Sequence, residues 1–343
     1  MTTYKGIQGL NITAVASDPS NPLEGEIWYN TTAKKFRGQG KYVVAAAWST
    51  SPTSLNSGRR QCEGSGTANN GIGFLGYIGG YPRYGTGETW NGSSWTNIPS
   101  TPTPLGESAS HVGDSSSAAG VGGNYYSGPS GLGATNYHFT WNGSSFSTAT
   151  NLPVQRYIMA SAGTTDDFTL TSGSDYNGGS QPSLNTYEWN GSSWSTGGSM
   201  ISISPTGQYV QGFGSSQNMA TMANDSASNA WYTYNGTAWS TSPTTLNRTV
   251  TGRSNWGTTS SAVAAGGGTP AIPRTGTEVW NGSSWSTSAT TNHNHINALR
   301  NNHPGSSSPA GWLFGGGPGN GVSQGETFVG PADSVTKVNL DFS

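Results

Sequence analysis

The chain has 343 residues, of which 52 are Gly and 18 are Pro, and only 9% are charged, against about 25% in a typical soluble protein. This composition excludes a helical bundle, and no stretch approaches the ~20 apolar residues of a membrane span. The net charge of −2 argues against a nucleic-acid partner, and the single cysteine, Cys62, excludes a disulfide framework or a cysteine zinc site. The 13 Trp, 15 Tyr and 9 Phe argue against disorder and predict many short strands joined by tight turns.

The N-terminal residues 1–40 differ in composition from the rest of the chain. No secretory signal peptide is expected, because no basic segment followed by an apolar one opens the sequence. Glu26 to Phe36 predict a β-hairpin, and a segment this short buries little core of its own. We therefore expect a small attachment or oligomerisation segment over residues 1–40 and a second domain over residues 41–343. Four of the five lysines lie at or before the boundary, namely Lys5, Lys34, Lys35 and Lys41.

A hexapeptide of the form Trp-Asn-Gly-Ser-Ser-Trp recurs in the second domain, and its last aromatic residue returns every 45 to 51 residues. Asn-Gly predicts a hairpin tip, either a type I′ turn with positive φ at both residues or a turn one or two residues longer. The asparagines also match glycosylation acceptors, but the turn explains them better. The flanking aromatic residues are expected to pair across neighbouring strands. The repeat positions are Trp48, Trp90, Trp95, Trp141, Phe146, Trp189, Trp194, Tyr234, Trp239, Trp280 and Trp285.

A short apolar run ending in a glycine pair lies between most successive hexapeptides, for example at residues 118–123 and 262–267. Such pairs are expected where strands crowd together near a central axis. The sequence in this order (glycine pair, variable loop, Glu-x-Trp or Glu-x-Tyr, turn, Trp) resembles the kelch repeat, in which each repeat forms one four-stranded blade of a β-propeller. The resemblance implies an all-β fold, a six-bladed kelch-like β-propeller. The arginine that follows the Trp in that family is matched by Arg59, Arg156, Arg248 and Arg300.

The two ends of the second domain are predicted to share one blade, as in other propellers. Residues 41–48 form an apolar strand that ends at a repeat Trp, whereas the last unit has no hexapeptide. We expect residues 41–48 to be the outermost strand of the blade built by residues 300–343. Deleting the last ten residues would then unfold the whole ring.

The N-terminal segment carries a second resemblance. Ser17 to Pro22, followed by Gly25-Glu26-Ile27-Trp28-Tyr29-Asn30, is similar to the N-termini of virion proteins of tailed phages, especially marine ones. The resemblance implies a non-enzymatic virion structural protein without cofactor, on the particle exterior, assembled in the host cytoplasm. Residues 1–40 would bind other virion proteins, in a homo-oligomer or in many copies. The propeller would act as a tail-fibre or receptor-binding subunit for a host glycan or protein, with capsid decoration as the alternative.

The loops between the glycine pair and the next hexapeptide vary most in length, from 10 residues after Gly80 to 18 after Gly123. Variable loops on a rigid scaffold are where binding residues concentrate, and Tyr combines a flat contact surface with a hydroxyl. The alternative is that these side chains pack within their own loops. The candidate ligand-binding residues are Tyr81, Arg83, Tyr84, Tyr125, Tyr126, Asp175 and Tyr176.

Catalytic or metal chemistry has fewer candidate residues. Asp166 and Asp167 are neighbours, which point to opposite faces on a strand and fit a polar loop better than a glycosidase pair. A pair assembled from different blades keeps a carbohydrate-active propeller enzyme as the second hypothesis. An intracellular kelch-type adaptor is the third, disfavoured by the charge-poor surface. His293 and His295, with His303 nearby, could share a metal if the chain or a symmetry mate supplied a third ligand, but a loop role is favoured and no metal is expected.

Overall fold

The structure is a computed structural model that describes residues 12–23, 25–59, 64–76, 85–103, 109–126, 132–174, 183–201, 211–222, 228–268, 274–296, 299–300, 310–317 and 323–340. Every regular element in these ranges is a β-strand, so the all-β class is confirmed. The same ranges contain no helix of the length and apolarity that a membrane span requires. The chain divides into two compact units: unit 1 is Met1–Ala46 with Pro331–Ser343, and unit 2 is Ala47–Gly330.

This division differs from the one expected at residues 40 and 41. The first unit extends to Ala46, and the last residues of the chain join it instead of the final repeat. The difference arises because residues 35–44 form one long strand that pairs with the C-terminal strand, a contact over almost 300 residues of sequence.

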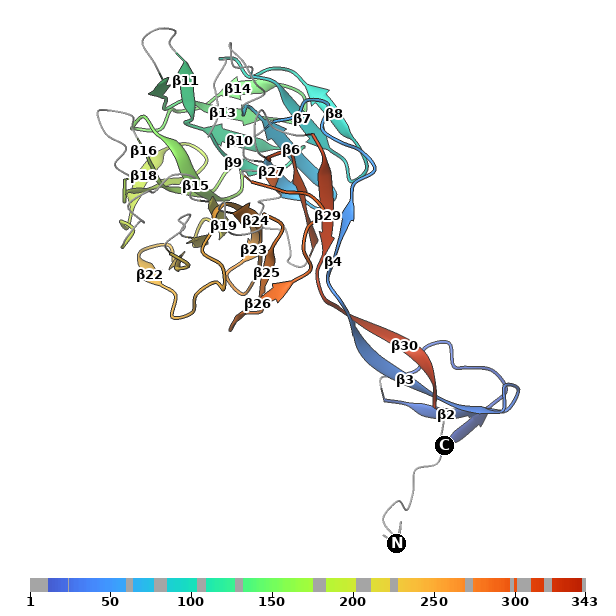
Figure 1. Ribbon diagram of the computed structural model, residues 1–343. Coiled ribbons are helices and arrows are strands. Elements are labelled where there is room, and N and C mark those ends of the chain that lie inside the picture. Colours follow the sequence, from blue (N-terminus) through green and yellow to red (C-terminus); the bar gives the residue numbers. More distant parts are fainter. Residues whose placement is uncertain are drawn as a thin grey trace. The chain divides into compact units, whose positions relative to one another are not determined.

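Unit 1 holds one four-stranded sheet, in the order β1 (Thr13–Val15), β2 (Ile27–Asn30), β3 (Lys35–Val44) and β30 (Ala332–Leu340). β1 is parallel to β2, and the other pairs are antiparallel, with β3 and β30 side by side (Figure 1). The predicted hairpin is confirmed as β2 and β3, closed at Asn30 and Lys35. The carboxylate of Asp18 links β2 to β3. It accepts hydrogen bonds from Trp28 Nε1 (3.0 Å) and Asn30 Nδ2 (2.7 Å) on β2 and from Arg37 Nη1 (2.8 Å) on β3.

Unit 2 holds six four-stranded antiparallel sheets and one small hairpin among its described residues. Sheet 1 is formed by β5 (Gly64–Thr67), β6 (Asn70–Phe74), β7 (Gly87–Trp90) and β8 (Trp95–Ile98). Sheet 2 is formed by β9 (Ser110–Gly113), β10 (Ala118–Val121), β13 (His138–Trp141) and β14 (Phe146–Thr148). Sheet 3 is formed by β15 (Tyr157–Gly163), β16 (Phe168–Ser174), β17 (Thr186–Trp189) and β18 (Trp194–Gly197). The hairpin pairs β11 (Asn124–Tyr126) with β12 (Leu132–Ala134).

Sheets 4 to 6 repeat this order of strands. Sheet 4 is formed by β19 (Gln211–Ser215), β20 (Asn218–Met222), β21 (Trp231–Tyr234) and β22 (Trp239–Thr241). Sheet 5 is formed by β23 (Thr251–Thr258), β24 (Ser261–Gly268), β25 (Thr277–Trp280) and β26 (Trp285–Ser288). Sheet 6 is formed by β27 (Leu299–Arg300), β28 (Ala310–Phe314), β29 (Gly325–Val329) and β4 (Ala47–Thr50).

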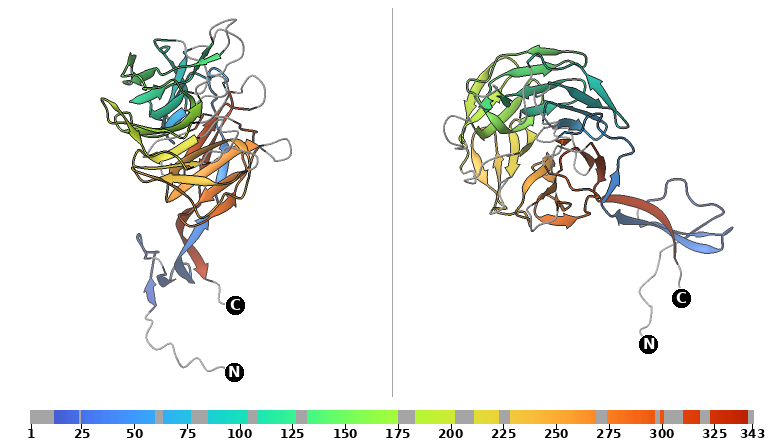
Figure 2. Two further views of the ribbon diagram at one scale, coloured as in Figure 1. Left: turned by 90° about the vertical axis from the view of Figure 1, so that its left-hand side faces the viewer. Right: turned by 45° about the horizontal axis from the view of Figure 1, so that its top comes forward.

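The first strands of the six sheets contact one another in cyclic order, β5 to β9, β15, β19, β23, β27 and back to β5. Figure 2 shows these sheets arranged around a common centre. Each sheet buries side chains against the next, as in the cluster that joins Phe213, Ala220 and Met222 of sheet 4 to Ala262 and Trp280 of sheet 5. Sheets of this kind in this order are compatible with a propeller-like fold.

The paired aromatic residues of the repeat have the same geometry in all six sheets. The two aromatic residues face each other in register on the third and fourth strands, as Trp90 faces Trp95. The centroid separations are 5.5 Å for Trp90 and Trp95, 4.9 Å for Trp141 and Phe146, 5.2 Å for Trp189 and Trp194, 5.0 Å for Tyr234 and Trp239, 5.5 Å for Trp280 and Trp285, and 5.0 Å for Trp48 and Phe328.

The last of these pairs joins the two ends of unit 2. Trp48 on β4 lies opposite Phe328 on β29, so a strand from near the N-terminus completes the sheet built by the last repeat. The strand is Ala47–Thr50, however, and not the expected residues 41–48. Residues 332–340 lie in the sheet of unit 1, so the expectation that the C-terminal residues belong to the last blade is wrong.

The hexapeptide turn is longer than a two-residue type I′ turn. The register Trp280 to Trp285 leaves four residues in the loop, and of the Asn-Gly pair only the glycine has positive φ, +92° at Gly282. The side-chain oxygen of Asn281 accepts hydrogen bonds from the backbone N–H groups of Ser283 and Ser284, both at 2.9 Å. The asparagine is therefore required by the turn, and the longer alternative is confirmed.

The glycine pairs link neighbouring sheets. Gly266 and Gly267 both have positive φ, +66° and +65°, and Gly267 N–H donates to the carbonyl oxygen of His295 at 2.8 Å. A Cβ atom at Gly266 would lie 2.6 Å from that same oxygen. The crowding that the sequence predicts is present, but here the crowding atom belongs to the segment leading into the next sheet.

Candidate functional site

Most of the predicted ligand-binding residues lie outside the described residues, namely Tyr81, Arg83, Tyr84, Asp175 and Tyr176, as do Cys62 and His303. Tyr125 and Tyr126 lie on β11, and their side chains are also outside the described part. The binding role of these residues stays a prediction. Asp166 and Asp167 occupy an exposed turn between β15 and β16, which confirms the polar-loop interpretation.

A buried glutamate stands on the third strand of three sheets, at Glu88, Glu278 and Glu326. Each accepts a hydrogen bond from a backbone N–H of the segment that leads into its sheet: Asn56 at 2.7 Å, Asn247 at 2.5 Å and Asn292 at 2.7 Å. These are the glutamates of the Glu-x-aromatic pattern. Their carboxylates hold the connection between neighbouring sheets.

Two cationic side chains occupy equivalent places beside these glutamates. Arg59 Nη2 lies 2.8 Å from Glu88 Oε1, and its Nη1 donates to the carbonyl oxygens of Leu75 and Thr86. Arg248 Nη1 donates in the same way to the carbonyl oxygens of Gly266 and Gly276.

In sheet 6 this place is held by a histidine. His295 Nε2 lies 2.9 Å from Glu326 Oε2, and its Nδ1 lies 3.1 Å from the carbonyl oxygen of Gly315. The expected match at Arg300 is therefore wrong, because the shorter His295 takes the position of the repeat arginine. Burial alone would raise the pKa of Glu326, but hydrogen bonds from His295 and from the amides of Asn292 and His293 hold it below its ordinary value.

The two histidines of the His-x-His motif are not a prepared metal site. Both ring nitrogens of His295 face protein acceptors, and His293 is partly exposed, with its Nδ1 3.7 Å from Glu326 Oε1. Within the ranges given above, no group of three His, Cys, Asp or Glu side chains could hold a metal ion.

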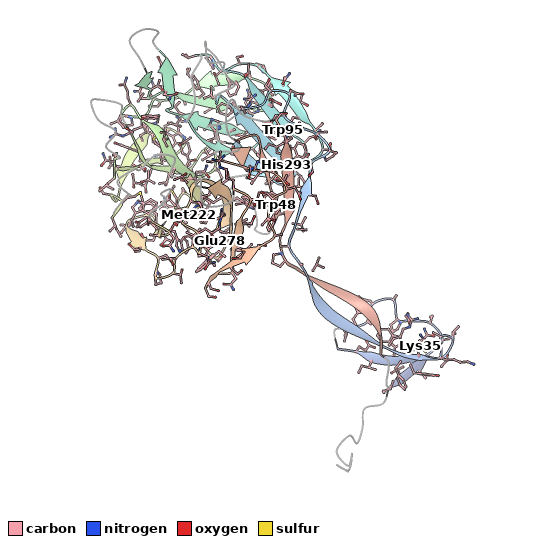
Figure 3. The ribbon with its side chains drawn as sticks, viewed as in Figure 1. Lys35, Trp48, Trp95, Met222, Glu278 and His293 are labelled. Atoms are coloured by element: carbon pink, nitrogen blue, oxygen red, sulfur yellow. The ribbon has the colours of Figure 1, made fainter. Side chains whose placement is uncertain are left out.

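A polar cluster that the sequence did not single out lies between sheets 4 and 5. Arg253 on β23 is only 3% exposed, and its Nη2 donates to the carbonyl oxygens of Arg248 (3.2 Å) and Val250 (3.0 Å). Burial lowers the pKa of Arg253 to about 10. Glu278, labelled in Figure 3, belongs to the same cluster, and burial raises its pKa. A comparison of the repeats could have revealed Arg253. Each of sheets 2, 3 and 5 has a glycine with positive φ in its first strand, and the residue four positions before that glycine is Ala109, Met159 or Arg253, so only sheet 5 has a charged residue there.

The fold therefore defines the chain as an all-β protein built from four-stranded sheets in a propeller-like order. No protein-family model matches the sequence, and no curated protein matches it. Among solved structures, one titled "Structure of YjhT" is similar, with a TM-score of 0.63 over 84% of this chain and 99% of that chain. The sequence identity is 13%, so the similarity concerns the fold alone.

Proposed function

We propose that the protein is a non-enzymatic structural protein of a tailed-phage virion, attached through unit 1 and displaying unit 2 as a receptor-binding module of the tail-fibre type. Unit 2 is then a six-bladed kelch-like β-propeller, with sheets 1 to 6 as its blades. The cyclic contacts of the first strands and the six equivalent aromatic pairs support this number of blades.

The observation that carries the attachment role is the place at which unit 1 leaves the ring. In five sheets a four-residue turn joins the paired aromatic residues. In sheet 6 no turn joins Phe328 to Trp48: the chain enters unit 1 after Gly330, and it leaves unit 1 before Ala47. The chain therefore passes between the two units at the position of one turn, and unit 1 interrupts none of the other five turns of unit 2. Unit 1 also exposes apolar side chains, with Leu23 74% and Ile27 44% exposed, which a partner in the particle would cover.

The proposed binding surface lies at the loops between the second and third strands. These loops follow β6, β10 and β16 in three consecutive sheets, and loops at equivalent positions of a repeated blade are expected at one face of a propeller. All seven candidate residues, Tyr81 to Tyr176, belong to them. Their ligand would be a glycan or protein of the host surface, bound by aromatic contact and hydroxyl hydrogen bonds.

The test is the location of the protein in purified virions. Mass spectrometry of particles should detect it in many copies, and gold-labelled antibody should mark the tail. Label on the head would favour the capsid-decorating alternative, and absence from the particles would overturn the proposal. Turnover of host polysaccharide by the purified full chain would replace it with the carbohydrate-active enzyme.

A further inference from the structure

We propose that the junction between sheets 4 and 5 binds a small hydrated monovalent anion, with Arg253 as its main ligand. The proposal does not depend on the virion role. It follows from which side chains face the junction, from their missing hydrogen-bond partners and from their charges.

Strand alternation places three polar side chains in this junction. On β19, Gln211 shares a face with Phe213, which packs against Ala262 and Ala264 of sheet 5. On β23, Asn255 lies in register with Ala264, and Arg253 is two residues away on the same face. Gln211 therefore faces Arg253 and Asn255, and Asn255 Nδ2 donates to the backbone oxygen of Gln211 at 3.1 Å.

These side chains are buried with unused hydrogen-bonding atoms. Arg253 Nε and Nη1 have no hydrogen-bond partner, and neither have Gln211 Oε1 and Asn255 Oδ1. The residues are 3%, 7% and 0% exposed, respectively. Leaving a buried polar group unpaired costs about 1–3 kcal/mol, and more if it is charged, so such groups in a native protein are normally satisfied by a bound ion or water.

The unpaired atoms of Arg253 identify the ligand as an anion. The guanidinium is a buried cation, and its Nε and Nη1 are both donors, so the group that they bind must accept hydrogen bonds. In the junction of Arg59, by contrast, one arginine pairs with Glu88, and all three guanidinium nitrogens of Arg59 have acceptors. A buried cation whose donors lack acceptors is costly, and one monovalent anion would accept from both of them.

The fold does not need a charge at this position. Met159 stands at the equivalent place on β15, inside an apolar cluster with Val112 and Leu170. An arginine here therefore serves something other than packing. A halide or a small carboxylate would accept from Nε or Nη1, and the water that hydrates it would donate to the two amide oxygens.

The test uses the full chain with bromide and formate as probes. In crystals grown with sodium bromide, an anomalous peak is expected within hydrogen-bond distance of the Arg253 guanidinium. Bromide should also raise Tm saturably by a few degrees, ~2–4 °C, beyond sodium sulfate of equal ionic strength. Formate in place of bromide distinguishes a carboxylate site from a halide site.

Arg253→Met should fold, since it copies Met159, and should lose the bromide-dependent rise in Tm. Lys35→Met removes one positive charge from an exposed position of unit 1 and should keep the rise. A bromide response that persists in Arg253→Met would overturn the proposal. The proposal would also be overturned if the wild-type crystal showed no anomalous peak at Arg253, a result that needs no variant. A peak without any rise in Tm would overturn it as well, because it would mean an adventitious ion only.

Discussion

Single buried polar side chains connect the sheets of unit 2. In sheet 1 the connection is the ion pair of Arg59 with Glu88, in which Arg59 Nη2 lies 2.8 Å from Glu88 Oε1. The equivalent pair in sheet 6 contains His295, whose two ring nitrogens can both donate only when the ring is protonated. The lowered pKa of Glu326 means that this carboxylate stabilises the fold above its unfolded pKa and loses that contribution as the pH falls.

His138 provides the sharpest test at the residue scale. It is fully buried beside Trp189, with ring centroids 4.8 Å apart, and desolvation lowers its pKa from 6.5 to about 4 despite a hydrogen bond to Thr150. The unfolded chain binds the proton near pH 6.5 but the folded chain does not, so stability is lost as the pH falls from 6.5 towards 4. We expect about 2 kcal/mol less unfolding free energy at pH 5 than at pH 7 from this group, measured by urea denaturation.

The matched variant for this test is His138→Gln, which retains a side-chain donor for Thr150. Its unfolding free energy should fall much less between pH 7 and pH 5 than that of the wild type. The pH dependence that remains in the variant comes from other groups, such as Glu326. An unchanged slope in the variant would contradict the assignment to His138.

At the scale of elements, the repeated hairpin is the unit of construction. Its stability depends on a cross-strand aromatic pair, on an asparagine that replaces missing backbone partners in the turn, and on a glycine at positive φ. All three lie within six residues of sequence, so the same solution recurs in five sheets. The sixth sheet keeps the aromatic pair without the turn.

The turn between β25 and β26 allows these contributions to be separated. Asn281→Ala should lower the unfolding free energy by about 1 kcal/mol, because two backbone N–H groups lose their acceptor. Gly282→Ala should cost a similar amount, since φ is +92° there. Ser283→Ala is the control, because it keeps the backbone N–H and removes only an exposed hydroxyl that donates to Asn281 Oδ1 at 2.9 Å, and we expect a change within ~0.5 kcal/mol. Chemical denaturation measures all three, and a costly Ser283→Ala with a neutral Asn281→Ala would refute this account.

For the whole molecule, the two ends of the chain serve two different structures. Trp48 completes sheet 6 of unit 2: it packs against Phe328, and its Nε1 donates to Thr277 in the neighbouring sheet at 3.0 Å. Trp28 is buried in unit 1, where it donates to Asp18. Residues 334–343, whose loss was expected to unfold the ring, include most of β30 in the sheet of unit 1.

These assignments predict separable effects on the two units. Trp48→Ala should lower the unfolding free energy of unit 2 by about 3–5 kcal/mol, and Trp28→Ala should do the same to unit 1 without affecting unit 2. Deleting residues 334–343 should speed amide hydrogen exchange in β3 and leave β15 and β23 protected. Hydrogen exchange measured by mass spectrometry reads out each strand separately. Loss of protection throughout unit 2 after the deletion would restore the original expectation that the C-terminus closes the ring.

The sequence was sufficient for every feature that a short stretch of chain decides. Alternating strands, turns and aromatic pairs depend on residues a few positions apart, so the hexapeptide predicted the hairpins and the all-β class. The pairing of Trp48 with the last repeat was expected by analogy with the way other propellers close. The candidate binding residues Tyr81 to Tyr176 were chosen by loop variability and remain predictions. What could not be read from the sequence is which distant side chains meet across the sheets. The pairing of β3 with β30, the place of His295 beside Glu326, and the hydrogen bond from Asn255 to Gln211 all depend on how distant strands pack. Those arrangements are set by burial over the whole chain and not by neighbours in sequence.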